Sequence, residues 1–317
     1  MKTRTPAIAA RVGGVLFCIS VMAGCGGSMN QLPSGSISES GLPATRPPSR
    51  SLRYALLADT QNNVIDVFTR TGKLTNQITN GISGPSGLSV DTQNNLWVAN
   101  SQNVVMFAPG ATSPTRTLAD PNQLPADVNA AANGTVYVAN FSSTGGTQYG
   151  PGSISVYAPG HTNPTRFLRD PKAQYDDSVT TDSAGNVFTT INDYTYVGYI
   201  DEFVGGKQSG FKRLAPAFSF ALTIRMNDAG NLVVLDQLQQ RITEFTEGGK
   251  PTGRKLNTNG NWIAFALASS GTLVLGSEDS VDSFKGILST FPRYDRVRRF
   301  HVPGMGLIGG VAFWGTR

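Results

Sequence analysis

Six polar side chains recur at one place in a repeated strand pattern, and their oxygen atoms could bind a cation or a polar ligand. Each follows the first apolar residue of a short apolar strand by four or five positions. They are Asp59, Asn100, Asn140, Asn192, Asp236 and Ser277. Oxygen ligands suit Ca²⁺, which makes Ca²⁺ a candidate ligand, but no pattern in the chain specifies it and no cofactor is predicted. We favour the alternative that these side chains are structural, because Asp and Asn before a tight turn hydrogen-bond the backbone of that turn.

A second group of candidate ligand-binding residues lies in two long connections that we expect on one face of the fold. They are Tyr149, within residues 142–152, and Tyr194 and Tyr196, within residues 193–198. Tyrosine offers flat amphipathic surface that can stack on sugars or pack against protein. The acidic pair Asp176 and Asp177 is expected near the same rim. The alternative is that both connections are tolerated loops without a ligand.

The strands that must position these residues repeat about every forty residues. They begin at Leu96, Val136, Val187, Leu232 and Leu273, which are separated by 40, 51, 45 and 41 positions. The chain has 36 Gly and 18 Pro in 317 residues, a composition rich in turns, and no long window shows the 3.6-residue period of an amphipathic helix. A period near forty in units made of strands is typical of propeller blades. The sequence therefore predicts an all-β protein.

The two ends of the chain predict how such a ring closes. Residues 54–78 supply three strands of a blade without its innermost strand, and residues 310–314 resemble the innermost strands elsewhere. Pairing the two segments would close the ring and remove free sheet edges. The other blades begin near Gly84, Leu124, Tyr175, Phe218 and Asn261, so the count is six, and the period also allows seven. The β-propeller domain is expected over residues 51–317.

Two strand–turn–strand segments carry a resemblance to a known family. In residues 58–68 and 235–245, an Asp precedes the turn and a Val-Ile or Arg-Ile strand ends in an aromatic residue. This pattern resembles the NHL repeat, over residues 51–317. The resemblance implies a six-bladed propeller of the kind that binds proteins, polymers or small ligands. We therefore favour a non-catalytic binding or scaffolding module for a protein, a glycan or a small ligand.

Some six-bladed propellers are enzymes, which makes a hydrolase or lyase the competing hypothesis. Gluconolactonase-like hydrolases need Glu, Asn and Asp on inner strands around a divalent cation, but the expected inner strands contain no Glu. The virginiamycin B lyases are expected to use a His base at the channel mouth. Here His161 falls in an outer turn and His301 at the end of an outer strand. No catalytic residue and no metal ligand is predicted.

The first fifty residues predict export and a lipid anchor. Residues 12–22 form an apolar run that follows three basic residues and is too short to span a bilayer. The run ends in Met22-Ala23-Gly24-Cys25, which resembles the lipobox of bacterial lipoproteins, with Met where Leu, Val or Ile is usual. We expect a signal peptide over residues 1–24 and lipidation of Cys25. Ordinary secretion and an uncleaved anchor are the alternatives.

The segment after the signal predicts the location and the partners. Residues 25–50 are rich in Gly, Ser and Pro and are expected to form a flexible tether. Gly26 lacks the Asp that retains many lipoproteins at an inner membrane, which favours the outer membrane. Subtracting the three basic residues of the signal from 26 leaves 23 against 21 acidic residues, a net charge of +2. Export and this near-neutral charge argue against nucleic acid, so we expect a monomer that contacts the membrane and an envelope protein or glycan.

Overall fold

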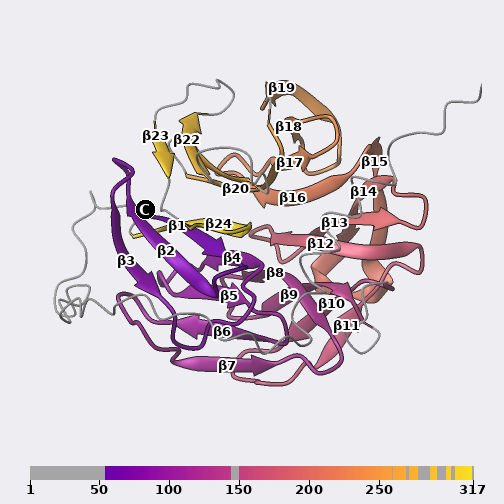
Figure 1. Ribbon diagram of the computed structural model, residues 1–317. Helices are drawn as coiled ribbons and strands as arrows, with labels where there is room; N and C mark the ends of the chain where they lie inside the picture. Colours follow the sequence, from indigo (N-terminus) through magenta and orange to yellow (C-terminus); the bar gives the residue numbers. More distant parts are fainter. Residues whose placement is uncertain are drawn as a thin grey trace, which may run out of the picture.

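The computed structural model describes residues 54–143, 150–258, 260–268, 271–277, 286–290, 298–300 and 304–315. These residues form six four-stranded antiparallel sheets around a common centre (Figure 1). Helical structure in them is limited to two 3₁₀ turns, η1 (Val204–Gly206) and η2 (Gln208–Gly210). The predicted all-β propeller is therefore confirmed.

Each sheet is one blade, in which four strands follow one another from the centre outward. The first three blades are β24 (Ile308–Trp314), β1 (Tyr54–Asp59), β2 (Val64–Thr69) and β3 (Leu74–Ile78); β4 (Gly87–Val90), β5 (Leu96–Ala99), β6 (Asn103–Phe107) and β7 (Arg116–Ala119); and β8 (Leu124–Ala130), β9 (Val136–Ser142), β10 (Ser153–Tyr157) and β11 (Arg166–Leu168). The next three are β12 (Ala173–Thr181), β13 (Val187–Asp193), β14 (Gly198–Phe203) and β15 (Phe211–Phe218); β16 (Ala221–Met226), β17 (Leu232–Asp236), β18 (Arg241–Phe245) and β19 (Pro251–Asn257); and β20 (Trp262–Leu267), β21 (Thr272–Ser277), β22 (Gly286–Thr290) and β23 (Arg298–Phe300).

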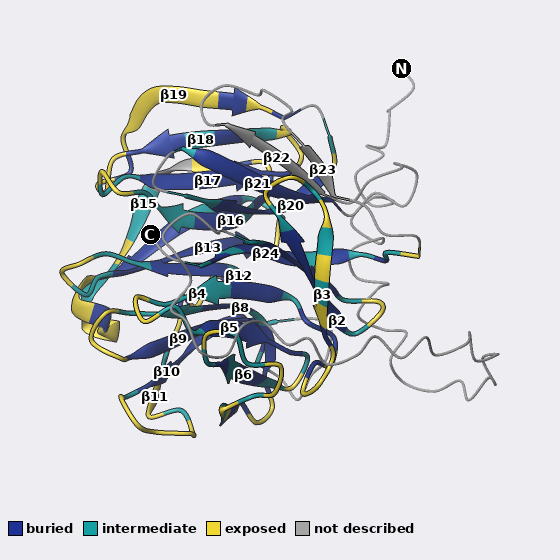
Figure 2. Ribbon diagram, turned by 90° about the vertical axis from the view of Figure 1, so that its left-hand side faces the viewer, coloured by how far each residue is buried: buried dark blue, intermediate teal, exposed yellow. Residues whose placement is uncertain are grey.

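The apolar strands of the sequence become the second strand of each blade because both faces of that strand are covered. Every residue of β9, β17 and β21 is buried, whereas the outer strand β19 is exposed along most of its length. Figure 2 shows the same gradient, with buried residues in the middle strands and exposed residues at turns and outer edges. A strand packed on both faces reads as a continuous apolar run rather than an alternating one.

The turns between first and second strands fold through local side-chain hydrogen bonds. Asp91 accepts hydrogen bonds from the backbone N–H groups of Gln93 and Asn95, each at 2.9 Å. Gly134 and Gly230 occupy corresponding turns with φ of 83° and 75°, a region that favours glycine. The Gly-Thr and Gly-Asn pairs in the sequence therefore set where β9, β13, β17 and β21 begin.

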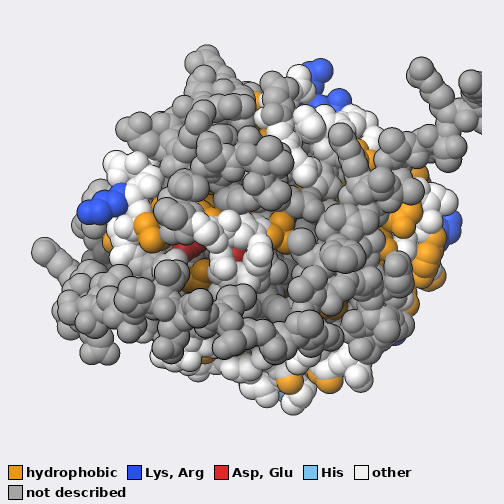
Figure 3. Space-filling view, in the orientation of Figure 1, with side chains coloured by type: hydrophobic (Ala, Val, Ile, Leu, Met, Phe, Trp, Pro, Cys, Tyr) orange, Lys and Arg blue, Asp and Glu red, His pale blue; other side chains and the backbone are white. Residues whose placement is uncertain are grey.

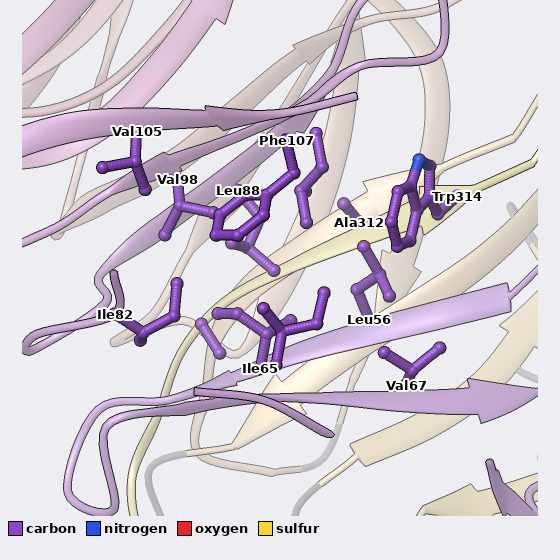
Figure 4. Packing of buried hydrophobic residues seen from close by; sticks show 13 residues of the cluster. Leu56, Ile65, Val67, Ile82, Leu88, Val98, Val105, Phe107, Ala312 and Trp314 are labelled. Carbon is purple, nitrogen blue, oxygen red and sulfur yellow. The ribbon is translucent and has the colours of Figure 1, made fainter. Parts of the chain in front are cut away.

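The C-terminal strand closes the ring as predicted. β24 pairs antiparallel with β1, with Leu56 opposite Ala312 and Tyr54 opposite Trp314. Figure 4 shows Ala312 and Trp314 packed beside Leu56, in a cluster that continues into the neighbouring blade. The Trp314 indole N–H also donates to the carbonyl of Asn94 in that blade, at 2.9 Å. The last strand thus completes the first blade and joins it to the second.

The N-terminal predictions fall on residues that lie outside the described part of the chain. These are the signal peptide of residues 1–24, the lipidated Cys25 and the tether, so all three stay predictions. Within the described residues, no helix is long and apolar enough to cross a membrane.

Candidate functional site

Because every blade has the same strand order, the turns that leave the second strands share one face of the ring. We call it the rim face. Its described turns are residues 60–63, 100–102, 193–197 and 237–240. The six polar residues singled out in the sequence stand at the ends of these second strands.

Asp59 and Asp236 hold backbone on the rim face. Asp59 accepts from the N–H of Asn62 at 2.9 Å and from the N–H of Gly306 at 2.7 Å. Asp236 accepts from the N–H groups of Ser219 at 2.9 Å and Gln239 at 3.2 Å. Each carboxylate therefore ties its own turn to the segment that enters a first strand.

Asn100 and Asn192 hold loops in the same way. The Asn100 side chain accepts from the N–H of Ser83 at 3.1 Å and donates to the carbonyl of Gly81 at 2.9 Å. Asn192 exchanges two hydrogen bonds with Ala221 of the next blade, donating at 2.7 Å and accepting at 3.1 Å. Asn192 therefore locks the rim of β13 to the rim of β16.

Asn140 and Ser277, the other two members, are buried like the first four. The Asn140 amide donates to Ser155 at 2.8 Å, and Ser155 donates to Asp120 at 2.7 Å, which links two blades. The Ser277 hydroxyl donates to the carbonyl of Asn261 at 3.2 Å. The described residues contain no group of three or more His, Cys, Asp and Glu arranged to hold a metal. The hypothesis that Ca²⁺ binds at the channel mouth, which the sequence did not favour, stays untested.

Among the described residues of the rim face, the turn at residues 193–197 presents the most exposed large apolar side chain, Tyr194, which is 58% exposed. The Asp193 carboxylate fixes this turn by accepting from the N–H and hydroxyl of Thr195, at 2.8 and 2.7 Å, and from the N–H of Val197, at 3.1 Å. Burial is the largest single influence on the pKa of Asp193 and raises it, but these hydrogen bonds and the charge of Lys172 together outweigh burial and lower the pKa. The turn is thus held from inside.

Tyr196 anchors that turn on an aromatic base. It packs against a buried cluster of Leu124, Phe141 and Tyr175. The rings of Phe141 and Tyr175 stack with centroids 4.0 Å apart and planes 11° from parallel. Tyr196 therefore supports the turn by packing against the core, whereas Tyr194 faces outward. Tyr149, the third predicted tyrosine, lies outside the described residues.

The adjacent blade adds a residue that sequence reasoning missed. Leu238, in the turn after β17, is 44% exposed. Next to it, Gln239 donates through its side-chain amide to the hydroxyl of Ser219 at 2.9 Å. The sequence could have indicated this exposure, because Leu238 stands among three glutamines in the turn of residues 237–240 and belongs to no apolar strand. We call the exposed set Tyr194, Thr195, Ser219, Leu238 and Gln239 the platform.

Asp176, the first residue of the predicted acidic pair, contributes no exposed carboxylate to the platform. That residue is 2% exposed and accepts from the Thr189 hydroxyl at 3.2 Å. Burial raises the pKa of Asp176 to about 8, with a smaller effect from Asp177. Asp201, on the next strand but one, also has a pKa raised to about 8 by burial and by Asp176. Asp177 accepts from the Asn192 amide at 2.6 Å, and burial raises its pKa to about 7.

An ion pair that the sequence did not reveal braces the innermost strands. Arg225 of β16 donates to Asp127 of β8 at 2.7 Å and to Ser178 of β12 at 2.8 Å. The Ser178 hydroxyl donates to the same Asp127 oxygen at 2.5 Å. On the face shown in Figure 3, acidic side chains are visible near the centre, and the described Lys and Arg lie toward the edge. The brace satisfies both charges, so it supplies packing rather than a free reactive group.

The residues that the enzyme hypothesis requires are not gathered at the centre in the described chain. His161 is exposed in the turn between β10 and β11, where its backbone N–H donates to the carbonyl of Ala158 at 3.0 Å. His301 lies outside the described residues. The innermost strands β24, β4, β8, β12, β16 and β20 contain no Glu.

Comparison with known proteins supports the fold and goes no further. No protein-family model matches the chain, and no curated protein matches it. A solved structure of a protein of unknown function from Bacteroides caccae is similar with a TM-score of 0.62 and 12% identity, covering 83% of this chain and 99% of that one. A chain from a solved nidogen/laminin complex is similar with a TM-score of 0.63 and 15% identity, covering 83% of this chain and 98% of that one. At such identities the likeness concerns the β-propeller fold alone.

Proposed function

We propose that this protein is a lipid-anchored propeller of the cell envelope that acts as a non-catalytic binding or scaffolding module. The observation that carries the proposal is the platform. Its exposed tyrosine and leucine stand on adjacent blades, and the turn that carries the tyrosine is held by three hydrogen bonds to Asp193. Exposed apolar groups on a rigid scaffold are typical of recognition surfaces.

The fold neighbours are consistent with a binding role. A chain of similar fold occurs in the solved nidogen/laminin complex, so a propeller of this size is found within a protein assembly. The paired charges at the centre support the same interpretation, because Arg225 and Asp127 satisfy one another.

The anchor completes the proposal. A lipidated Cys25 followed by 25 residues of tether would place the ring within roughly 25–30 Å of the membrane, from about 5–6 Å × √n for a flexible chain. Such a tether lets the rim face turn toward partners at the envelope. The outer membrane is the proposed location, because Gly26 follows the cysteine.

Site-specific photo-crosslinking in cells tests the binding function. A photoreactive amino acid at Thr195 samples the platform, and the same group at Ser209 samples the opposite face, where residues 204–210 connect β14 to β15. Both positions are exposed, so the two variants should fold alike. We expect adducts of protein or glycan at position 195 that are absent at 209. Equal labelling at both positions, or none at either, would contradict a binding role for the rim face.

A further inference from the structure

We infer that the platform binds a neutral glycan, an inference that rests on the proposed binding function and specifies its ligand. Exposed apolar surface is scarce on the described chain. Among the described residues, the exposed large apolar side chains are Tyr194, Val204 and Leu238. Val204 belongs to η1, in the connection between β14 and β15 on the opposite face, which leaves two among the described residues of the rim face. A stable protein interface buries about 800 Å² per partner around an apolar core, and these two described side chains do not make such a core.

The platform also carries no charge of its own. Its members present one phenol, two hydroxyls, one amide and one aliphatic group. The charges at its edge are of opposite sign, because Asp193, whose one carboxylate oxygen accepts three hydrogen bonds within the turn, lies near the exposed Lys172, whose charge helps to lower the pKa of Asp193. Anionic ligands are usually recognised through several Arg or Lys side chains, and these two opposite charges do not make such a site. Amide and hydroxyl groups can both donate and accept, which matches the hydroxyl groups of an uncharged sugar.

Hydrogen bonds between and within the two blades also hold the platform rigid. Blade β12–β15 and blade β16–β19 are joined at this rim by the two Asn192–Ala221 hydrogen bonds. A side chain at Gly198 would come within 2.6 Å of the Ala221 nitrogen, so the two blades are in close contact there. The Gln239–Ser219 hydrogen bond fixes the far side of the platform. Sugars bind weakly per atom, so a surface that loses little conformational freedom on binding is what they require.

The tyrosine supplies the expected orientation of the sugar. The exposed ring of Tyr194 gives a flat face on which the C–H groups of a pyranose can lie, while its hydroxyl stays in water. The adjacent blade adds the exposed Leu238, and Ser219 and Gln239 place polar groups on the rim of that same blade. The arrangement fits a chain of sugar units that crosses from one blade to the next.

Calorimetric titration of the full-length protein in detergent with defined hexasaccharides tests this inference. The neutral probes are cellohexaose, maltohexaose, xylohexaose and chitohexaose, and oligogalacturonate is the anionic probe. We expect at least one neutral probe to bind, without dependence on salt. Tyr194→Ala should weaken that binding by roughly tenfold or more, since one aromatic contact is worth about a factor of ten. Tyr194→Phe should keep it, because the ring face is retained.

Two controls separate this inference from the broader binding function. Val204→Ala removes an exposed apolar side chain from the opposite face and should leave glycan affinity unchanged. Both alanine variants should melt like the parent, because the residues are exposed. Failure of every neutral probe to bind, salt-dependent binding of oligogalacturonate alone, or equal affinity in Tyr194→Ala would overturn the glycan inference. If photo-crosslinks at Thr195 then yield protein adducts, the binding function stands and the ligand class is wrong.

Discussion

Replacing Asp176 by Asn should make the stability of the ring depend less on pH. Asp176 is buried, and its pKa is raised from 3.8 to about 8, mainly by burial. In the unfolded chain this carboxyl ionises near 3.8, so between the two values the folded state binds more protons. Its contribution to stability is therefore complete below about pH 4 and is lost as the pH rises through about 8.

The size of the effect follows from the same shift. One such carboxyl changes the free energy of unfolding by about 1.4 kcal/mol per pH unit, or on the order of 5 kcal/mol over the whole interval. Asp201 is raised to about 8 as well, partly by Asp176, so the two contributions overlap and do not simply add. Asp176→Asn keeps an acceptor for the Thr189 hydroxyl and removes the charge.

Urea unfolding at pH 5, 6, 7 and 8, followed by tryptophan fluorescence, measures this prediction. The parent should lose stability steadily as the pH rises, and the variant should show a slope smaller by about 1.4 kcal/mol per unit. Asp193→Asn is the matched control, because the pKa of Asp193 is lowered and its stabilising effect is lost toward low pH, with the opposite sign. Identical slopes for the parent and Asp176→Asn, or a parent that gains stability from pH 5 to 8, would refute the reasoning.

Three further predictions concern the anchor, the ring closure and the central ion pair. Cys25→Ala should abolish acylation and leave the precursor either uncleaved or released, as read by fractionation and lipid labelling; a variant that still sediments with membranes at the mature mass would contradict the lipoprotein hypothesis. Deleting residues 307–317 removes three fully or almost fully buried large side chains of β24, each worth roughly 1.5–3 kcal/mol, against a net stability of about 5–15 kcal/mol. The truncated protein should unfold or aggregate, whereas deleting residues 26–48 should leave the melting temperature nearly unchanged; a monomeric truncation that melts like the parent would argue against the closed ring. Arg225→Ala leaves Asp127 buried without its ion-pair partner and should cost about 3–5 kcal/mol in urea unfolding, and adding Asp127→Ala should recover part of that loss. No recovery in the double variant would show that the two charges are not coupled.

The architecture could be predicted from the sequence because the features that define a blade are local. A strand buried on both faces must be a run of apolar residues, and a tight turn must contain residues that tolerate its backbone angles. The second strands could therefore be predicted to begin at residues such as Leu96, Val136 and Leu232. The strand missing from residues 54–78 was likewise predicted at residues 310–314.

Which side chains are available for binding could not be predicted, because exposure depends on contacts between distant segments. Irregular pairing of β12 with β13, with register shifts near Tyr175 and Ser178, separates the adjacent residues Asp176 and Asp177, and only the first is fully buried. No strand period reports such a shift, since one extra residue changes the face on which every following side chain lies.

The central ion pair and the platform also could not be predicted, because both depend on contacts between distant segments. Arg225 and Asp127 are 98 positions apart in the chain and meet because three blades bring their innermost strands together. Tyr194 could be singled out as a loop tyrosine, but the structure showed that Asn192 ties its blade to the one that carries Leu238. Repeats specify each blade separately, whereas a surface shared by two blades exists only once the ring has closed and their rims are in contact.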